Sequence, residues 1–268
     1  MSTPLLDPVE IQSHKAHVNA RGLNLWPQDR PQDLLHIQGF ALWLKALRGE
    51  SLLHHPFYPL ALPVDRHFSA RMAYYFAAGD YEQADMQLID ECIEAGDRVM
   101  ECGAGAGVTG SLAAKCSGNP VVLVEPNSHM YARIKATFAA NGQQVILVEG
   151  AVVPDSTAAE HIELGVYDEY WWSSALAPAQ ADRQCRVRAL RLSALLAEHQ
   201  PTVLVLDIEG GEIGLFPAKL PACLRLIMIE IHTPEIGERA TVEVVNRILA
   251  QGFRLSRLLA QTWLFVKE

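Results

Sequence analysis

Short apolar runs alternate with longer amphipathic segments over most of the chain. The short runs are apolar on both faces, which is typical of parallel strands covered by helices on two sides. Strands that alternate with helices in this way indicate a doubly wound α/β sheet. The predicted strands are 98–102, 121–125, 144–149, 202–207 and 226–231. The predicted helices are 81–97, 128–140 and 239–252, and 103–116 is a predicted loop followed by a helix.

The C-terminal pattern departs from this alternation. After the helix at 239–252, the segment 253–268 contains two β-like runs with almost no residues between them. A connection this short cannot make a parallel crossover, so the two runs must be antiparallel neighbours. We therefore predict a seven-stranded, mostly parallel sheet that ends in an antiparallel hairpin. Segment 151–192 contains an alternating run at 185–190, which the pattern does not place on the sheet.

The N-terminal residues 1–65 are rich in His, Pro and Gln. Only 34–49 has helical periodicity there, and it is apolar around most of its circumference. Such a helix must be covered; the main domain is the simpler cover, and the subunit interface of a homo-oligomer is the alternative. The prolines of 54–63 predict an extended connector. We expect a helical N-terminal extension over 1–65 and a single domain over 66–268.

Composition and charge limit the partners of the chain. The formal net charge of −9 argues against a nucleic-acid partner, because binding to phosphates requires clustered basic residues. The arginines at 183–191 have no interleaved aromatic residues, so they indicate a solvated face. The five cysteines form no CxxC pair. No apolar segment is nearly as long as the helix of about 20 residues that crosses a membrane. With no signal-peptide pattern, we expect a cytoplasmic protein without membrane partners.

The stretch VMECGAGAGVTG contains two overlapping glycine patterns. GAGAG begins at Gly103 and has Glu101 two places before it, whereas GAGVTG is a GxGxxG of the kind that binds NAD. The Glu101 carboxylate would repel a pyrophosphate, but it suits the amino group and sulfonium of S-adenosylmethionine. The loop therefore favours S-adenosylmethionine. An NAD-dependent oxidoreductase that uses Gly105, Gly107 and Gly110 is the alternative.

A second acidic residue, Glu125, ends the predicted strand 121–125, about 20 residues after the glycine loop. A carboxylate at this place can accept hydrogen bonds from both ribose hydroxyls of an adenosine, in either cofactor. The EGA sequence at 149–151 ends the third strand, where the adenine would lie, although an ordinary turn is the alternative. We expect Glu125, Pro126, Gly150 and Ala151 to contact the adenosine.

A run of carboxylates follows the fourth strand in VLVLDIEGGEIG. It places Asp207, Glu209 and Glu212 at the carboxyl edge of the sheet, where open α/β sheets bind ligands. Carboxylates this close repel each other unless they are solvated, hydrogen-bonded or near cations. For Glu212, a solvated position at a helix N-terminus is the structural alternative.

The next strand carries Glu230 and His232 on one face, because strand side chains alternate. His232 can accept the proton of a substrate hydroxyl or hold a nearby carboxylate. We predict His232 as the first candidate for the general base and Asp207 as the second. Asp207, Glu209 and His232 could instead bind a divalent metal, but their spacing matches no recognised metal motif, so we expect none.

Four motifs together, ECGAGAG, VEPN, DIEGGE and IEIH, resemble those of the FkbM-type methyltransferases from about Tyr81 to the C-terminus. The resemblance implies a Rossmann-like class I fold, S-adenosylmethionine as cofactor, and O-methylation of hydroxyls on sugars or natural products. The family usually has Asn or a similar residue where this chain has Ala106. By carry-over, Glu101, Gly103, Gly105, Gly107 and Glu125 bind the cofactor, and Asp207, Glu209, Glu230 and His232 line the transfer site.

The sequence thus predicts an S-adenosylmethionine-dependent O-methyltransferase that acts on a small-molecule acceptor by in-line displacement. Besides the NAD-dependent oxidoreductase, one further alternative remains. It is a non-catalytic protein of the same fold that binds a partner through the helix at 34–49.

Overall fold

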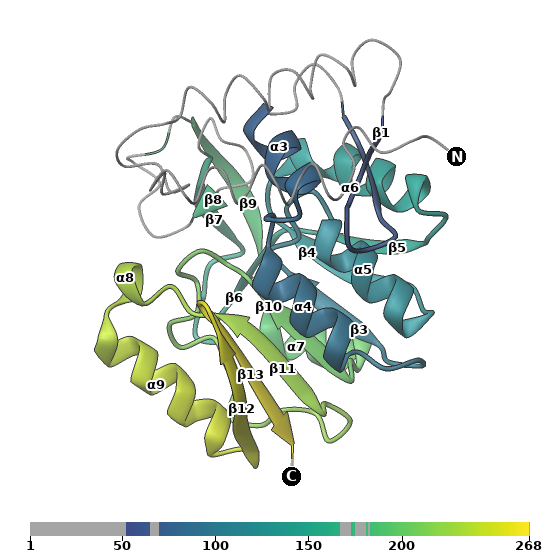
Figure 1. Ribbon diagram of the computed structural model, residues 1–268. Helices are drawn as coiled ribbons and strands as arrows, with labels where there is room; N and C mark the ends of the chain where they lie inside the picture. Colours follow the sequence, from purple (N-terminus) through teal and green to yellow (C-terminus); the bar gives the residue numbers. More distant parts are fainter. Residues whose placement is uncertain (1–51, 65–69, 167–172, 175–180, 182, 268) are drawn as a thin grey trace, which may run out of the picture. The chain divides into compact units, whose positions relative to one another are not determined.

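A seven-stranded sheet lies at the centre of residues 84–268 in the computed structural model (Figure 1). The strand order is β12-β13-β11-β10-β3-β4-β5. β13 pairs antiparallel with both β11 and β12, and the other neighbours are parallel, which confirms the predicted sheet and its C-terminal hairpin. The strands are β3 (Val99–Cys102), β4 (Val121–Glu125), β5 (Val145–Glu149), β10 (Val203–Leu206), β11 (Leu226–Glu230), β12 (Phe253–Leu259) and β13 (Thr262–Lys267).

Helices cover both faces of this sheet (Figure 1). Met100 and Cys102 of β3 pack in one apolar cluster with Leu196 and Ile248, which belong to α7 and α9. The side chain between them, Glu101, points to the opposite face, where α5 lies. The helices are α4 (Gln83–Cys92), α5 (Val108–Ser117), α6 (Ser128–Ala140), α7 (Leu192–His199), α8 (Thr233–Ile236) and α9 (Glu238–Leu249).

The segment that the sequence pattern did not place forms a small sheet of its own. Its strand order is β6-β9-β7-β8, with β6 parallel to β9 and the other pairs antiparallel. The alternating run at 185–190 lies in β9, and its arginines at 183, 186 and 188 are exposed, as expected for a solvated face. The strands are β6 (Ala151–Val153), β7 (His161–Val166), β8 (Ser173–Ser174) and β9 (Arg183–Arg191).

The predicted connector at 54–63 belongs to a hairpin of two short strands instead. β1 (Leu52–His54) and β2 (Ala61–Pro63) pair antiparallel and precede α3 (Ala70–Ala78). The turn between the strands is closed by His55, because its Nδ1 accepts the amides of Phe57 and Tyr58, both at 3.2 Å. Three-residue strands are too short to leave a periodic pattern, so the sequence indicated only extended chain.

The structure describes residues 52–64, 70–166, 173–174, 181 and 183–267. The predicted helix 34–49 and the predicted boundary between residues 65 and 66 lie outside the described residues. By its contacts the chain divides into two compact units, residues 1–83 and 84–268. Among the described residues, no helix has both the length and the apolar composition that crossing a bilayer requires.

A buried carboxylate, Asp97, joins three segments at the amino edge of the sheet. It lies just before β3 and forms a bidentate ion pair with Arg225, which precedes β11. It also accepts the Thr202 hydroxyl at 2.7 Å and the Glu94 amide at 2.8 Å. Burial alone would raise the pKa of Asp97, but the hydrogen bonds from Arg225, Glu94 and Thr202 outweigh burial and lower it. Ionised Asp97 therefore stabilises the folded state.

We expect Asp97→Asn to lower the free energy of unfolding by about 1–3 kcal/mol at neutral pH, because Arg225 then loses its charged partner. The Asp97 pKa is depressed in the folded state, so the stabilisation is present above its ordinary value of 3.8 and is lost as the pH falls below it. Urea unfolding of both proteins at several pH values measures the difference.

The matched control is Glu243→Gln, which removes the pair between Glu243 and Arg239 on α9. Both side chains are mostly exposed, so the change should stay within about 0.5 kcal/mol. Equal unfolding free energies for wild type and Asp97→Asn at neutral pH would contradict the role given to Asp97.

Candidate active site

The parallel register brings the predicted site residues to one edge of the sheet. Cys102 on β3 lies opposite Leu206 on β10 and Val124 on β4, and Leu206 lies opposite Ile229 on β11. The residues that follow these positions therefore emerge together at the carboxyl edge. They are the glycine loop, Glu125, the DIEGGE turn and His232, as the sequence predicts.

The glycine loop lies directly against the backbone of the DIEGGE turn. A Cβ on Gly103 would overlap the carbonyl oxygen of Asp207, and Gly103 has a φ of 87°. The Asp207 amide donates to the Cys102 carbonyl at 3.0 Å, so the two segments are held together. The loop ends at Gly107, which has a φ of 75° and directly precedes the first turn of α5. We call the loop from Gly103 to Gly107 the glycine cradle, because without side chains here the backbone can approach a ligand closely.

Glu125 connects the loop to the end of β4. It is buried, and its Oε1 accepts the Asn127 amide at 2.7 Å while its Oε2 accepts the Gly105 amide at 3.1 Å. Burial raises the pKa of Glu125 to about 7, although the amide hydrogen bonds oppose the shift. The carboxylate has four acceptor sites, and the amides of Asn127, Gly105 and Ala104 occupy three of them, so one remains for a ribose hydroxyl. This donor and acceptor set fits an adenosine cofactor.

Glu101 is less accessible than its position in the sequence suggested. It is only 3% exposed, and its Oε1 accepts the Thr109 hydroxyl of α5 at 2.5 Å. Its Oε2 has no hydrogen-bond partner among the described residues. Burial raises the pKa of Glu101 to about 8. The carboxyl thus supports the first turns of α5, and its predicted contact with a cationic cofactor stays a prediction.

Gly110, the last glycine of GxGxxG, is required by packing. A Cβ there would lie 2.5 Å from Glu101 Oε2 and 2.7 Å from the Leu123 side chain. The helix can approach β3 and β4 this closely only without a side chain at this position. Any strand–loop–helix unit with such close packing needs a glycine here. The GxGxxG pattern therefore does not distinguish NAD from S-adenosylmethionine.

The third predicted contact region, at 149–151, lies beside Glu125. The Gly150 amide donates to the Glu125 carbonyl at 3.0 Å, and Gly150 has a φ of 148°. A Cβ on Gly150 would crowd Leu190 and the Arg188 carbonyl of β9. Ala151 is buried and begins β6, and Pro126 is half-buried. Gly150 thus has a packing role of its own, and adenine contact by these residues stays a prediction.

His232 lies at the centre of a carboxylate cluster next to the glycine loop. Its Nδ1 is 2.9 Å from Glu212 Oε1, and its Nε2 is 3.2 Å from Glu209 Oε2 and 3.6 Å from Asp207 Oδ1. Glu230 Oε1 is 4.0 Å from the same Nε2. The structure therefore brings together the predicted transfer-site residues, although they come from two separate segments.

Glu212 is the most buried member of the cluster, and the sequence interpretation left its role open. It is 0% exposed, and its Oε1 also accepts the Gly210 amide at 3.1 Å. The alternative of a solvated helix N-terminus is wrong, because residues 209–214 form turns and Glu212 is fully buried. The turn is possible because Glu209 and Gly210 both have positive φ, 48° and 95°. The DIEGGE motif itself was the signal for this residue.

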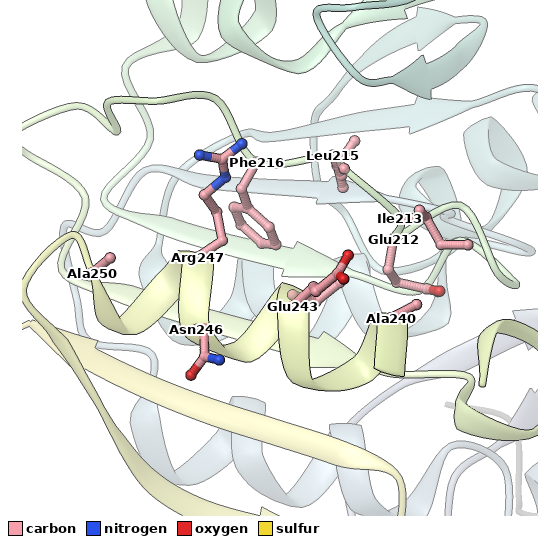
Figure 2. A pocket seen from close by; sticks show the side chains of 11 residues that line it. Glu212, Ile213, Leu215, Phe216, Ala240, Glu243, Asn246, Arg247 and Ala250 are labelled. Atoms are coloured by element: carbon pink, nitrogen blue, oxygen red, sulfur yellow. The ribbon is translucent and has the colours of Figure 1, made fainter. Parts of the chain in front are cut away.

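A cavity of about 450 Å³ lies between the turn 212–216 and α9 (Figure 2). Glu212 and Ala240 are at one end of it, and Arg247 and Ala250 are toward the other (Figure 2). Glu212 thus contacts His232 on one side and borders this cavity on the other.

Among the described residues, the cluster contains more carboxylates than basic groups. Burial alone would lower the pKa of His232, but Glu209, Glu212 and Asp207 raise it to about 11. Burial raises the pKa of Glu230 to about 7, with a contribution from the charge of Asp85.

Asp85 of α4 extends the cluster. Sequence reasoning missed this residue, because it occupies an ordinary polar position of a predicted helix. It is buried and accepts the Thr262 hydroxyl at 3.1 Å. Burial raises the pKa of Asp85 to about 6, although the Thr262 hydroxyl opposes the shift. Its link to β11 and β13 appears only in the folded chain.

The strand order, with its antiparallel C-terminal hairpin, is that of the Rossmann-like class I methyltransferase fold. The model of the methyltransferase FkbM domain matches residues 101–255, more than half of the chain, and the chain belongs to this family. It is an S-adenosylmethionine-dependent methyltransferase. The alternatives of an NAD-dependent oxidoreductase and of a non-catalytic protein are therefore wrong.

Solved structures with similar backbones include methyltransferases, all at low sequence identity. Precorrin-6y C5,15-methyltransferase from Geobacter metallireducens is 12% identical, with 70% of this chain and 89% of that chain covered and a TM-score of 0.44. A TehB-like methyltransferase from Corynebacterium glutamicum is 16% identical, with 74% and 95% covered and a TM-score of 0.40. No curated protein matches the chain.

The contact between the loop and Asp207 predicts the effect of Gly103→Ala. The new methyl group would overlap backbone, which cannot move aside as a flexible side chain could. We expect the free energy of unfolding to fall by more than about 3 kcal/mol. Urea unfolding monitored by circular dichroism measures the change.

Gly118→Ala is the matched control, because Gly118 has a similar φ of 71° but no atom within 4 Å of the position that a Cβ would take. It should cost only the backbone strain, about 1–2 kcal/mol. If the two variants are equally destabilised, the close approach of Gly103 to Asp207 is not the cause.

Proposed function

We propose that the chain transfers the methyl group of S-adenosylmethionine to a hydroxyl oxygen of a sugar or small natural product. The observation that carries the proposal is the contact between the glycine cradle and the carboxylate–histidine cluster through Gly103 and Asp207. A methyl donor held by the glycine cradle would lie next to proton acceptors of the carboxylate–histidine cluster. Hydroxyls are weak nucleophiles, so transfer to them requires such an acceptor.

The cofactor supplies an electrophilic methyl group on a sulfonium. Within the chain, Glu125 would bind a ribose hydroxyl, and the amides of the loop from Gly103 to Gly107 would line the cofactor. Pro126, Gly150 and Ala151 would border the adenine. In the part of the chain that the structure describes, carboxylates outnumber basic groups at this edge, which favours a ligand that carries positive charge.

Asp207 and Glu209 are the proposed acceptors of the hydroxyl proton. Their side chains are 30% and 26% exposed, so an acceptor molecule can approach them. His232, the first candidate from sequence, is 8% exposed, and carboxylates engage both of its ring nitrogens. We therefore assign His232 the positioning of Asp207 and Glu209. As the O–CH₃ bond forms and the S–CH₃ bond breaks, the hydroxyl proton moves to a carboxylate and then to solvent.

Cofactor binding is tested by the thermal shift with S-adenosylhomocysteine. At about 100 times its Kd, the ligand should stabilise the wild type by about 2.7 kcal/mol, or about 5–10 °C in Tm, and NADH should not. Glu125→Gln should lose at least half of the shift, because the amide replaces one ribose acceptor oxygen with a donor.

Glu198→Gln, on the exposed surface of α7, should keep the full shift. Circular dichroism of the unliganded variants separates a folding defect from a binding defect. A full shift in folded Glu125→Gln would refute the ribose contact.

Hydroxyl methylation is tested by S-adenosylhomocysteine production with a panel of sugars and polyhydroxylated natural products. Asp207→Asn should reduce kcat by about 10²–10⁴-fold, because it removes a proton acceptor, while S-adenosylhomocysteine still binds. Glu198→Gln again serves as the control. Product NMR that places the methyl group on nitrogen or sulfur would contradict the assignment to oxygen.

A further inference from the structure

Three potential metal ligands meet at the carboxyl edge of β10 and β11. One oxygen of Asp207, one of Glu209 and a ring nitrogen of His232 all lie within 4.8 Å of one another. His232 Nε2 is the shared point, 3.2 Å from Glu209 Oε2 and 3.6 Å from Asp207 Oδ1. Two ligands bound at about 2.1 Å to adjacent positions of an octahedral ion are about 3.0 Å apart. The observed separations need only a small contraction to reach that geometry.

The other nitrogen of His232 has the partner that a metal-bound histidine requires. Its Nδ1 lies 2.9 Å from Glu212, which is fully buried and is itself held by the Gly210 amide. Metal-binding histidines almost always donate their second N–H to a carboxylate or carbonyl, and this fixes the ring orientation. With its Nδ1–H given to Glu212, the ring presents the Nε2 lone pair to the other two carboxylates. Glu212 belongs to the same cluster but lies outside the three proposed ligands.

Charge and access also favour an ion at this point. Asp207 and Glu209 together carry two negative charges, which a divalent cation balances. Both side chains are partly exposed, so water or a substrate hydroxyl can occupy the remaining coordination positions. A donor set of carboxylates, one imidazole and water suits Mg²⁺ or Mn²⁺.

We propose that Asp207, Glu209 and His232 bind one divalent cation of the Mg²⁺/Mn²⁺ class. The inference rests on the proposed function, because the ion would hold the acceptor hydroxyl beside the methyl donor. As a Lewis acid it makes the proton of a bound hydroxyl more acidic and orients the oxygen. The proposed function assigns the cluster only the acceptance of a proton, and the ion adds binding of the hydroxyl that receives the methyl group. The competing interpretation is an ion-free cluster in which the doubly protonated ring of His232 bridges the carboxylates.

Mn²⁺ is the probe for the test, used with full-length protein that has been treated with EDTA and dialysed. Electron paramagnetic resonance of free Mn²⁺ and titration calorimetry give the stoichiometry and Kd. We expect one ion per chain, displaced by excess Mg²⁺. Glu209→Gln removes one ligand and should weaken binding at least about tenfold, and Glu212→Gln should weaken it about 10–100-fold through the histidine.

Glu243→Gln is the matched control, because it removes an exposed carboxylate of α9 without touching the cluster. Its Kd for Mn²⁺ should equal that of the wild type. Circular dichroism checks the folding of each variant. If Glu212→Gln does not fold, the partly exposed Glu209→Gln decides alone.

Saturable binding that is weakened in Glu209→Gln and unchanged in Glu243→Gln supports the site. No saturable binding to the wild type, or equal affinity in all variants, overturns it. The S-adenosylhomocysteine thermal shift on the same samples separates the two proposals. A shift without Mn²⁺ binding refutes only the ion, whereas Mn²⁺ binding without a shift refutes the proposed methyl transfer.

Discussion

The close approach of two backbone segments, at Gly103 and Asp207, is the constraint on which the site depends. β3 and β10 pair in register through Cys102 and Leu206, so the next residues on each strand emerge side by side. The Asp207 carbonyl occupies the space of a Cβ at position 103, and only glycine fits there. The contact that shapes the glycine loop therefore also places the DIEGGE turn beside it. The same backbone contact therefore holds the glycine loop and the carboxylate cluster next to each other.

Buried carboxylates hold both edges of the sheet, but in different electrostatic settings. At the amino edge, Arg225 compensates Asp97 and lowers its pKa. At the carboxyl edge, burial raises the pKa of Glu125 and Glu230, and His232 is surrounded by acidic groups. The described residues of the second edge thus include more acidic than basic groups, and a cationic ligand can stabilise them. The edge with more acidic groups is also the edge at which the glycine loop and the DIEGGE turn lie.

Much of the fold could be predicted because the core strands are apolar on both faces and the helices have a clear period. The strand bounds agree to within a residue or two, and α5 begins at Val108, directly after the glycine loop, as the predicted loop and helix at 103–116 require. The four-stranded sheet at 151–191 was not predicted. Its strands pair across long separations, as between His161 and Arg188, and local periodicity does not report such pairing.

The sequence by itself determined the class of sheet and the two turns at its carboxyl edge, because each depends on local patterns of glycine, carboxylate and apolar residues. It indicated the cofactor through the resemblance of four motifs to one family. Only the tertiary structure decided what each carboxyl contacts. It buried Glu101 under α5, turned Glu212 inward to hold His232, and brought Asp85 to Thr262 on β13. These partners are distant in sequence, and the burial that sets their charge arises from packing between elements. No local pattern encodes that burial.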